Sequence, residues 1–228
     1  MMKLYIGNKN YSSWSMRPWV LLTEAGIPFE EVYVRFDSFN AGSAFKKEIL
    51  KFNPAGRVPV LVDEDFPVWD TLAIAEYVAE RFPEKNLWPA DPRQRARARS
   101  VCAEMHSGFS ALRTHWGMNI EADLAEVGAQ VLAAQPGVRA DLDRIVSMWS
   151  ELLGESGGPM LFGHFTIADA FYVPVVTRLV TYGAPVPPQV KGYIDRVLAL
   201  PSVSAWCRDA RAEHDFLPFE EQYRTART

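Results

Sequence analysis

The sequence predicts an α/β unit built on a mixed four-stranded sheet, followed by an all-α helical unit. Short, β-prone apolar runs concentrate in the first 70 residues, as expected for strands. Prolines then interrupt the hydrophobic periodicity over residues 82–92, which is typical of an interdomain linker. Beyond this stretch the strand signal almost vanishes and helical periodicity replaces it. We therefore expect one domain at residues 1–82 and a second at residues 93–228.

Four apolar runs predict the strands, at residues 3–6, 31–35, 60–62 and 66–69. Three helices are expected between and after them, at residues 12–25, 45–51 and 71–81. The acidic residues 63–65 join the last two strands as a hairpin turn. This order combines a parallel βαβ crossover with an antiparallel hairpin, so one mixed sheet accounts for it with short connections.

Six helices are expected beyond the linker, at residues 93–116, 122–134, 138–153, 166–180, 189–200 and 203–212. The first is expected to be one long helix, with the arginines between Arg93 and Arg99 on a solvated face. Pro136-Gly137 separates the second helix from the third.

Composition narrows the classes of partner. The chain has 228 residues, 48% of them hydrophobic, and a net charge of -4. That charge offers no large basic field for nucleic acid. No segment has the length of a membrane span or the pattern of a signal peptide. Cys102 and Cys207 make no disulfide framework, so we expect two reduced, partly buried thiols in a soluble, cytoplasmic protein.

The run from Asn53 to Leu61 is the most informative candidate site. Asn53-Pro54 and the glycine that follows predict a turn. Pro59 lacks an N–H and therefore enters a strand at an edge or a bulge. A residue before proline is extended, so Val58 presents its N–H and C=O outward. These groups can bind an extended peptide by strand addition; the alternative is a plain strand entry.

Two helix starts offer further polar groups. Asp70-Thr71 begins a helix whose free N–H groups suit a carboxylate, while the Asp70 side chain suits an amine. The segment Tyr11-Ser12-Ser13-Trp14-Ser15-x-Arg17 follows the first strand, at the sheet edge where α/β proteins bind ligands. Helix capping is the alternative for both segments, although three serines exceed what one cap requires.

Together these segments resemble the glutathione transferase superfamily over nearly the whole chain. Residues 53–61 are similar to the family's stretch ending in a cis-proline. Residues 70–74 are similar to its acidic-residue/serine helix start, with Asp and Thr replacing the usual Glu and Ser. Residues 166–169 match the family's capping box. Ser-Ser-Trp-Ser resembles the serine-type, zeta-like motif, but Trp14 replaces its cysteine, which speaks against zeta-type isomerase chemistry.

The resemblance implies a thioredoxin-like first domain that binds glutathione as co-substrate in an extended conformation. Val58-Pro59, with a cis bond, would hold the cysteinyl segment of glutathione. Asp70-Thr71 would hold its γ-glutamyl end, and Lys46 or Arg57 would meet its glycine carboxylate. The family commonly forms homodimers, so a homodimer is expected here.

The resemblance also implies glutathione transferase activity toward a small hydrophobic electrophile. Ser12 would donate a hydrogen bond that stabilises the thiolate, with Ser13 as the adjacent alternative. Arg17, one turn into the helix, would add positive potential or tie down the loop. His106 and Arg113 would line the electrophile pocket, although a core or surface role is the alternative for each.

Other chemistries lack their motifs. The sequence has no Gly-x-Ser-x-Gly elbow for a serine hydrolase. It also has no clustered ligands for a metal, so no metal is expected. The remaining alternatives keep the fold and change the function. One is a non-catalytic binding or interaction protein, and the other is a glutathione-dependent peroxidase or dehalogenase.

Overall fold

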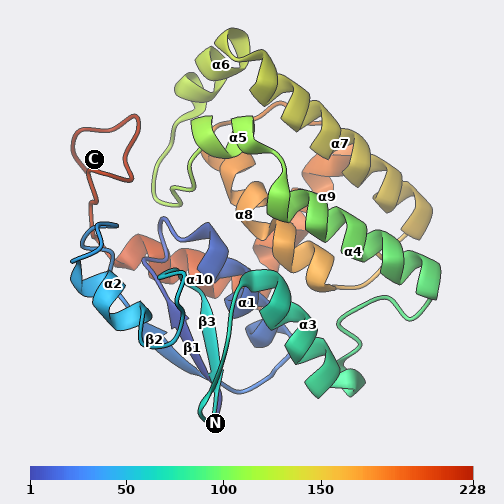
Figure 1. Cartoon of the computed structure of the whole chain (residues 1–228). Coiled ribbons are helices and arrows are strands. Elements are labelled where there is room, and N and C mark those ends of the chain that lie inside the picture. Colours follow the sequence, from blue (N-terminus) through green and yellow to red (C-terminus); the bar gives the residue numbers. More distant parts are fainter. Residues whose placement is uncertain (228) are drawn as a thin grey trace.

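The computed structural model describes residues 1–227, and its first part is built on one sheet (Figure 1). The strands are β1 (Lys3–Ile6), β2 (Glu30–Tyr33), β3 (Val60–Asp63) and β4 (Phe66–Val68). Their spatial order is β2-β1-β3-β4. The β1–β2 pair is parallel, whereas β3 runs antiparallel to both of its neighbours. The mixed four-stranded sheet predicted from the sequence is therefore confirmed.

Alternation along the strands divides the core of this part in two. Leu4 and Ile6 of β1 belong to the large apolar cluster that includes α1 (Ser13–Glu24) and α3 (Thr71–Arg81). Tyr5, between them, belongs to a second cluster with residues of α2 (Ala44–Ile49). Successive side chains of a strand point to opposite faces, so the sheet lies between α2 on one face and α1 and α3 on the other.

Helices make up the second part, which begins after the short 3-10 turn η1 (Pro83–Lys85). They are α4 (Pro92–Ser107), α5 (Ser110–His115), α6 (Ala125–Ala134), α7 (Pro136–Ser156), α8 (Ile167–Thr181), α9 (Pro188–Ala199) and α10 (Pro201–Ala212). Every residue of α8 except Val180 is buried, and α8 packs against α1, α4 and α9. Asp169 in its first turn accepts hydrogen bonds from the backbone N–H and the hydroxyl of Thr166, as expected from the capping box.

The single long helix predicted over residues 93–116 is wrong. The chain breaks after α4, where Gly108 is extended and Phe109 adopts a left-handed conformation with φ 53°. A Cβ on Gly108 would lie 2.7 Å from the carbonyl oxygen of Glu104, so the break depends on glycine. As a result, His106 and Arg113 belong to different helices. The other predicted helices of this part agree with the structure within three residues at each end.

The segment after α10 returns across the first part, as Figure 1 shows at the end marked C. Leu217 is buried in the same cluster as Tyr5. Asp215 pairs with Arg35 at 2.6 Å, and Phe219 packs edge-on against Phe39. The sequence predicted no structure here, yet these contacts join the end of the chain to the sheet.

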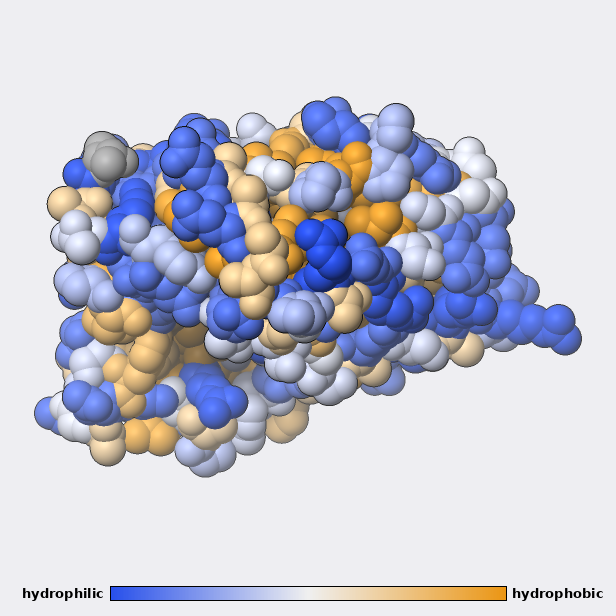
Figure 2. All heavy atoms as spheres, turned by 90° about the horizontal axis from the view of Figure 1, so that it is seen from above, coloured by the Kyte–Doolittle hydropathy of each residue, from blue (hydrophilic) through white to orange (hydrophobic). Residues whose placement is uncertain are grey.

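The character of the surface and the state of the two cysteines are as the composition leads us to expect. Viewed from above, hydrophilic residues cover most of the face, and hydrophobic residues gather in smaller patches (Figure 2). Cys102 and Cys207 are buried free thiols, as predicted. Among the helices of residues 1–227, none combines the length and the apolar character needed to cross a membrane.

Candidate functional site

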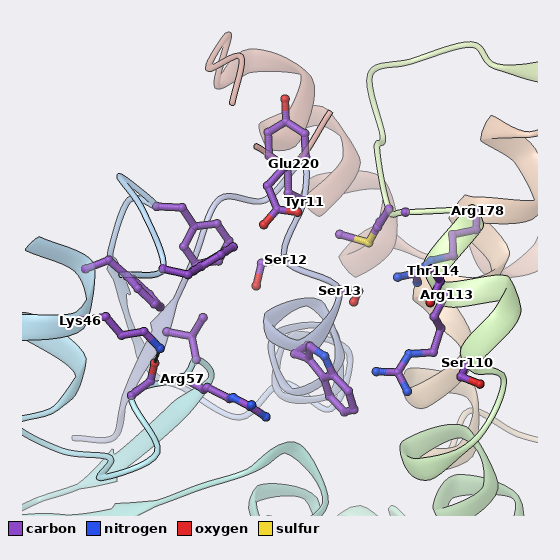
Figure 3. Close-up of a pocket in the computed structure, with 18 residues that line it drawn as sticks. Tyr11, Ser12, Ser13, Lys46, Arg57, Ser110, Arg113, Thr114, Arg178 and Glu220 are labelled. Atoms are coloured by element: carbon purple, nitrogen blue, oxygen red, sulfur yellow. Dashed lines mark hydrogen bonds between the residues drawn. The ribbon is translucent and has the colours of Figure 1, made fainter. Parts of the chain in front are cut away.

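A cavity of about 710 Å³ lies between the sheet-based part and the helical part. One wall comes from the loop after β1, from α2 and from the loop before β3. The facing wall comes from α5, α8 and the segment after α10. Figure 3 shows Lys46 and Arg57 on one side, Arg113 and Arg178 on the other, and Ser12 and Ser13 between them.

Ser12 occupies the N-cap position of α1, but its side chain makes no capping hydrogen bond. Its hydroxyl instead donates to the Oγ of Ser15 at 2.7 Å, and Ser15 also accepts the N–H of Gly7. Ser15 is fully buried, whereas Ser12 and Ser13 both line the cavity. Capping therefore does not account for the Ser12 hydroxyl, and two of the three serines can reach a ligand.

The neighbouring Tyr11 also lines the cavity, but its hydroxyl has another partner. It donates to the carboxylate of Glu221 at 2.6 Å. Burial and this carboxylate raise the pKa of Tyr11 above its ordinary value of 10.0. A phenol held in this way is a poor donor to a ligand in the cavity, which leaves the hydroxyls of Ser12 and Ser13 on this wall.

The loop between α2 and β3 is shaped by Asn53. Its Nδ2 donates to the carbonyl of Arg57 at 2.7 Å, and its Oδ1 accepts the N–H of Ala55. Gly56 adopts φ +61°, a left-handed conformation that favours glycine. The Val58-Pro59 bond is cis, as expected from the resemblance. Val58 lines the cavity, and within residues 1–227 its backbone N–H and C=O make no hydrogen bond.

Two cations border this loop. Lys46 of α2 lines the cavity and donates to the carbonyl of Gly56 at 2.6 Å. Arg57 is exposed on the same side, and the ion pairs found in the described part of the chain do not include it. Both are placed to meet an anionic ligand group that lies against the loop.

Asp70 and His106 lie outside the cavity and line a second pocket beside Trp69, and Thr71 is buried next to Asp70. Asp70 caps α3 by accepting the N–H of Leu72, and its other oxygen lies 3.3 Å from Nε2 of His106. The hydroxyl of Thr71 is buried without a partner among the described residues. Capping therefore occupies only one carboxylate oxygen of Asp70, and His106 lies nearer to this pocket than the sequence suggested.

Trp14 stands at the centre of a group of basic side chains. The guanidinium of Arg17 lies 4.1 Å from its ring centroid and that of Arg113 lies 4.8 Å from it. The ring of His106 meets it edge-on at 5.1 Å. Arg17 is buried, not at the loop surface, and burial, with Arg178 and Arg113 nearby, lowers its pKa to about 9.

Two charged lining residues were missed from the sequence, Arg178 of α8 and Glu220 of the last segment. Burial and the adjacent carboxylate of Glu221 raise the pKa of Glu220 to about 7. Arg178 has no local signal beyond being a charge in an apolar helix. No group of three or more His, Cys, Asp or Glu residues within 1–227 is arranged to hold a metal.

Comparison with protein families shows which family the chain belongs to. Residues 11–81 match the model of the glutathione S-transferase N-terminal domain, and residues 93–209 match that of the C-terminal domain. The chain belongs to the glutathione transferase superfamily. The resemblance inferred from its motifs is thereby confirmed.

Individual relatives agree with this membership. A zeta-class glutathione S-transferase of Euphorbia esula is 28% identical, over 75% of this chain and 73% of its own length. A maleylacetoacetate isomerase of Pseudomonas aeruginosa is 29% identical, over 88% of this chain and 93% of its own length. A glutathione transferase homologue from Burkholderia, crystallised with bound glutathione, superposes with a TM-score of 0.70 at 28% identity, covering 92% of this chain and 98% of that one.

Proposed function

We propose that this member of the superfamily is a glutathione transferase in which the Ser12 hydroxyl stabilises the thiolate of bound glutathione. The observation that carries the proposal is the position of Ser12. Its hydroxyl lines the cavity at the start of α1 and takes no part in capping the helix. The positive end of the helix dipole adds to the stabilisation of an anion there.

Glutathione would lie along the wall formed by residues 1–82, the glutathione-binding domain in this proposal. The unpartnered backbone of Val58 would pair with its cysteinyl segment. Lys46 and Arg57 would bind the glycine carboxylate. The γ-glutamyl end would extend out of the cavity to Asp70-Thr71, which do not line it. Glutathione bound to the related Burkholderia protein supports this ligand. Residues 93–228 would supply the side that faces the electrophile.

A hydrogen bond to the thiolate changes the amount of reactive nucleophile. A free thiol of pKa about 8.5 is roughly 3% ionised at pH 7, and only the thiolate attacks efficiently. A hydrogen bond to a charged group contributes roughly 1.5–3 kcal/mol, which lowers the pKa by roughly one to two units. The thiolate then forms roughly a quarter to three quarters of the bound population. It attacks the electrophile as the leaving group departs with its electron pair.

Glutathione-affinity chromatography and turnover of an aryl halide test the proposal together. Retention on the column with formation of the thioether is expected. Absence of both would instead support a non-catalytic interaction protein, and turnover of a hydroperoxide or a haloalkane alone would support the peroxidase or dehalogenase alternative. The proposal includes a homodimer, for which sedimentation should give twice the mass of one chain.

A further inference from the structure

Arg113 and Arg178 on the helical side of the cavity, and Arg17 of α1 behind Trp14, have no carboxylate partner among the described residues. Arg178 is 5% exposed, and its Nε and Nη1 donate to the backbone carbonyls of Trp116 and Pro174. Arg113 donates through Nη1 alone, to two backbone carbonyls. Nε and Nη1 of Arg17 are buried without any partner. Buried charges are ordinarily paired, so this cluster is an unbalanced charge.

The arginines also act on one another. Burial and the proximity of Arg113 lower the pKa of Arg178 to about 10. Among the described residues that line the cavity, Glu220 is the single carboxylate, and Figure 3 places it beside Tyr11 and away from Arg113. An anion bound between Arg113 and Arg178 would relieve the repulsion that the protein leaves uncompensated.

Stacking fixes the direction of one of these cations. The guanidinium of Arg113 lies over the ring of Trp14 at 4.8 Å, and its Nη1 is held by the carbonyls of His106 and Gly108. Its Nε and Nη2 have no partner within residues 1–227. Such a planar, pre-oriented fork binds carboxylates well.

The position of Arg113 and Arg178 relative to the serines indicates which of the two substrates they would bind. Lys46 and Arg57 lie across Ser12 and Ser13 from Arg113 and Arg178 (Figure 3). Glutathione against the loop wall would use the first pair, which leaves the second for the other substrate. We propose that Arg113 and Arg178 form a carboxylate subsite, so that the preferred electrophile is an anion. This inference rests on the proposed transferase function.

A matched pair of aryl chlorides tests the subsite. The probes are 4-chloro-3,5-dinitrobenzoate and 1-chloro-2,6-dinitrobenzene, which differ by the carboxylate alone. In both, the thiolate forms a C–S bond at the chlorinated carbon, the C–Cl bond breaks, and chloride leaves with the electron pair. Each enzymatic kcat/KM is divided by the rate of the uncatalysed reaction with glutathione, and the ratio of the two quotients is compared among variants.

The ratio should favour the benzoate in the wild-type protein and fall about 10-fold or more in Arg113→Gln. Arg97→Gln removes an exposed arginine that pairs with Glu151 and should leave the ratio unchanged. An equal ratio in wild type and Arg113→Gln, with both chlorides turned over, overturns the subsite and leaves the transferase function standing. No turnover and no glutathione binding overturn both.

A binding measurement separates the subsite from catalysis. Calorimetry with 3,5-dinitrobenzoate, which has no leaving group, is performed at saturating glutathione so that Lys46 and Arg57 are occupied. We expect binding to weaken about 10-fold or more in Arg113→Gln. Arg178→Lys should also weaken it, because an ammonium cannot bond the carbonyls of Trp116 and Pro174 in the guanidinium geometry and still present an N–H to the ligand. Unchanged affinity in both variants contradicts the inference.

A separate observation concerns Ser15. Its hydroxyl oxygen is fully buried, accepts the Gly7 N–H at 3.1 Å and lies 2.7 Å from the Oγ of Ser12. When Ser12 donates its proton to a thiolate, its oxygen can accept the proton of Ser15, because hydroxyl hydrogens rotate to suit their partners. We infer that Ser15 is a positioning residue that turns the Ser12 proton toward the sulfur through the chain Gly7–Ser15–Ser12.

A double-mutant cycle on the pKa of enzyme-bound glutathione tests this role. Polarisation strengthens a hydrogen bond by roughly 10–30%, so Ser15→Ala should raise the thiol pKa by about 0.5 unit or less. In a Ser12→Ala background the same substitution should have no effect, since Ser15 acts through Ser12. A shift of equal size in both backgrounds would assign Ser15 a structural role, and no shift in either would overturn the inference.

Discussion

Replacing Ser12 by alanine should raise the pKa of the bound glutathione thiol with little effect on the affinity for protonated glutathione. Ser12 is 6% exposed, so water competes little with its hydroxyl. A shielded hydrogen bond to an anion contributes roughly 1.5–3 kcal/mol. Its loss corresponds to a rise of roughly one to two pKa units, which lowers the thiolate fraction and kcat/KM at neutral pH by about 10-fold or more.

The assay follows the ultraviolet absorbance of the thiolate as the complex of protein and glutathione is titrated with base. Affinity is measured separately, at a pH low enough to protonate the thiol in both proteins. Ser13→Ala and Tyr11→Phe serve as matched controls, since each removes a hydroxyl from the same wall of the cavity. The reasoning is refuted if Ser13→Ala or Tyr11→Phe carries the shift, or if Ser12→Ala leaves the thiol pKa unchanged.

Three further predictions concern stability. Asp169→Ala leaves several buried donors without their acceptor and should lower the free energy of unfolding by about 3 kcal/mol or more. Asp195→Ala, at an exposed ion pair, should lower it by about 0.5 kcal/mol. Urea denaturation measures both changes. Glu220 has a folded-state pKa of about 7 against an ordinary 4.5, so its contribution to stability is complete below pH 4.5 and is lost as the pH rises through 7. The melting temperature of Glu220→Gln relative to wild type should therefore rise across that pH interval. A difference in melting temperature that does not depend on pH would contradict this. Gly128→Ala places a Cβ 1.9 Å from a backbone carbonyl oxygen, so it should melt well below wild type, unlike Gly154→Ala, where a Cβ meets open space.

The sheet and the loop before β3 were predictable because their determinants are local. A short run of apolar residues predicts β1, and proline with glycine fixes the turn before Pro59. Ser12 could be nominated for the same reason, since it follows a strand that ends at the binding edge of the sheet. The sequence offers nothing to separate Ser12 from Ser13, whereas in the structure the hydroxyl of Ser12 bonds to Ser15, which supports the proposal that Ser12 acts on the sulfur.

Features that depend on long-range packing were not predictable from one sequence. The break at Gly108 was missed for a different reason, because helical periodicity alone continues across it. Arg178 lies in an apolar helix, and its place on the cavity depends on how α8 packs against α1. Glu220 belongs to a segment without periodicity, whose position is set by contacts such as Leu217 against the sheet.

The central claim concerns which hydroxyl meets the sulfur. A crystal structure of the protein with glutathione bound tests it most directly. We predict that the sulfur lies within hydrogen-bonding distance of the Ser12 Oγ, with the cysteinyl backbone paired to Val58. A sulfur nearest to Ser13 or to Tyr11, or a glutathione molecule that leaves the Val58 backbone unpaired, would contradict it.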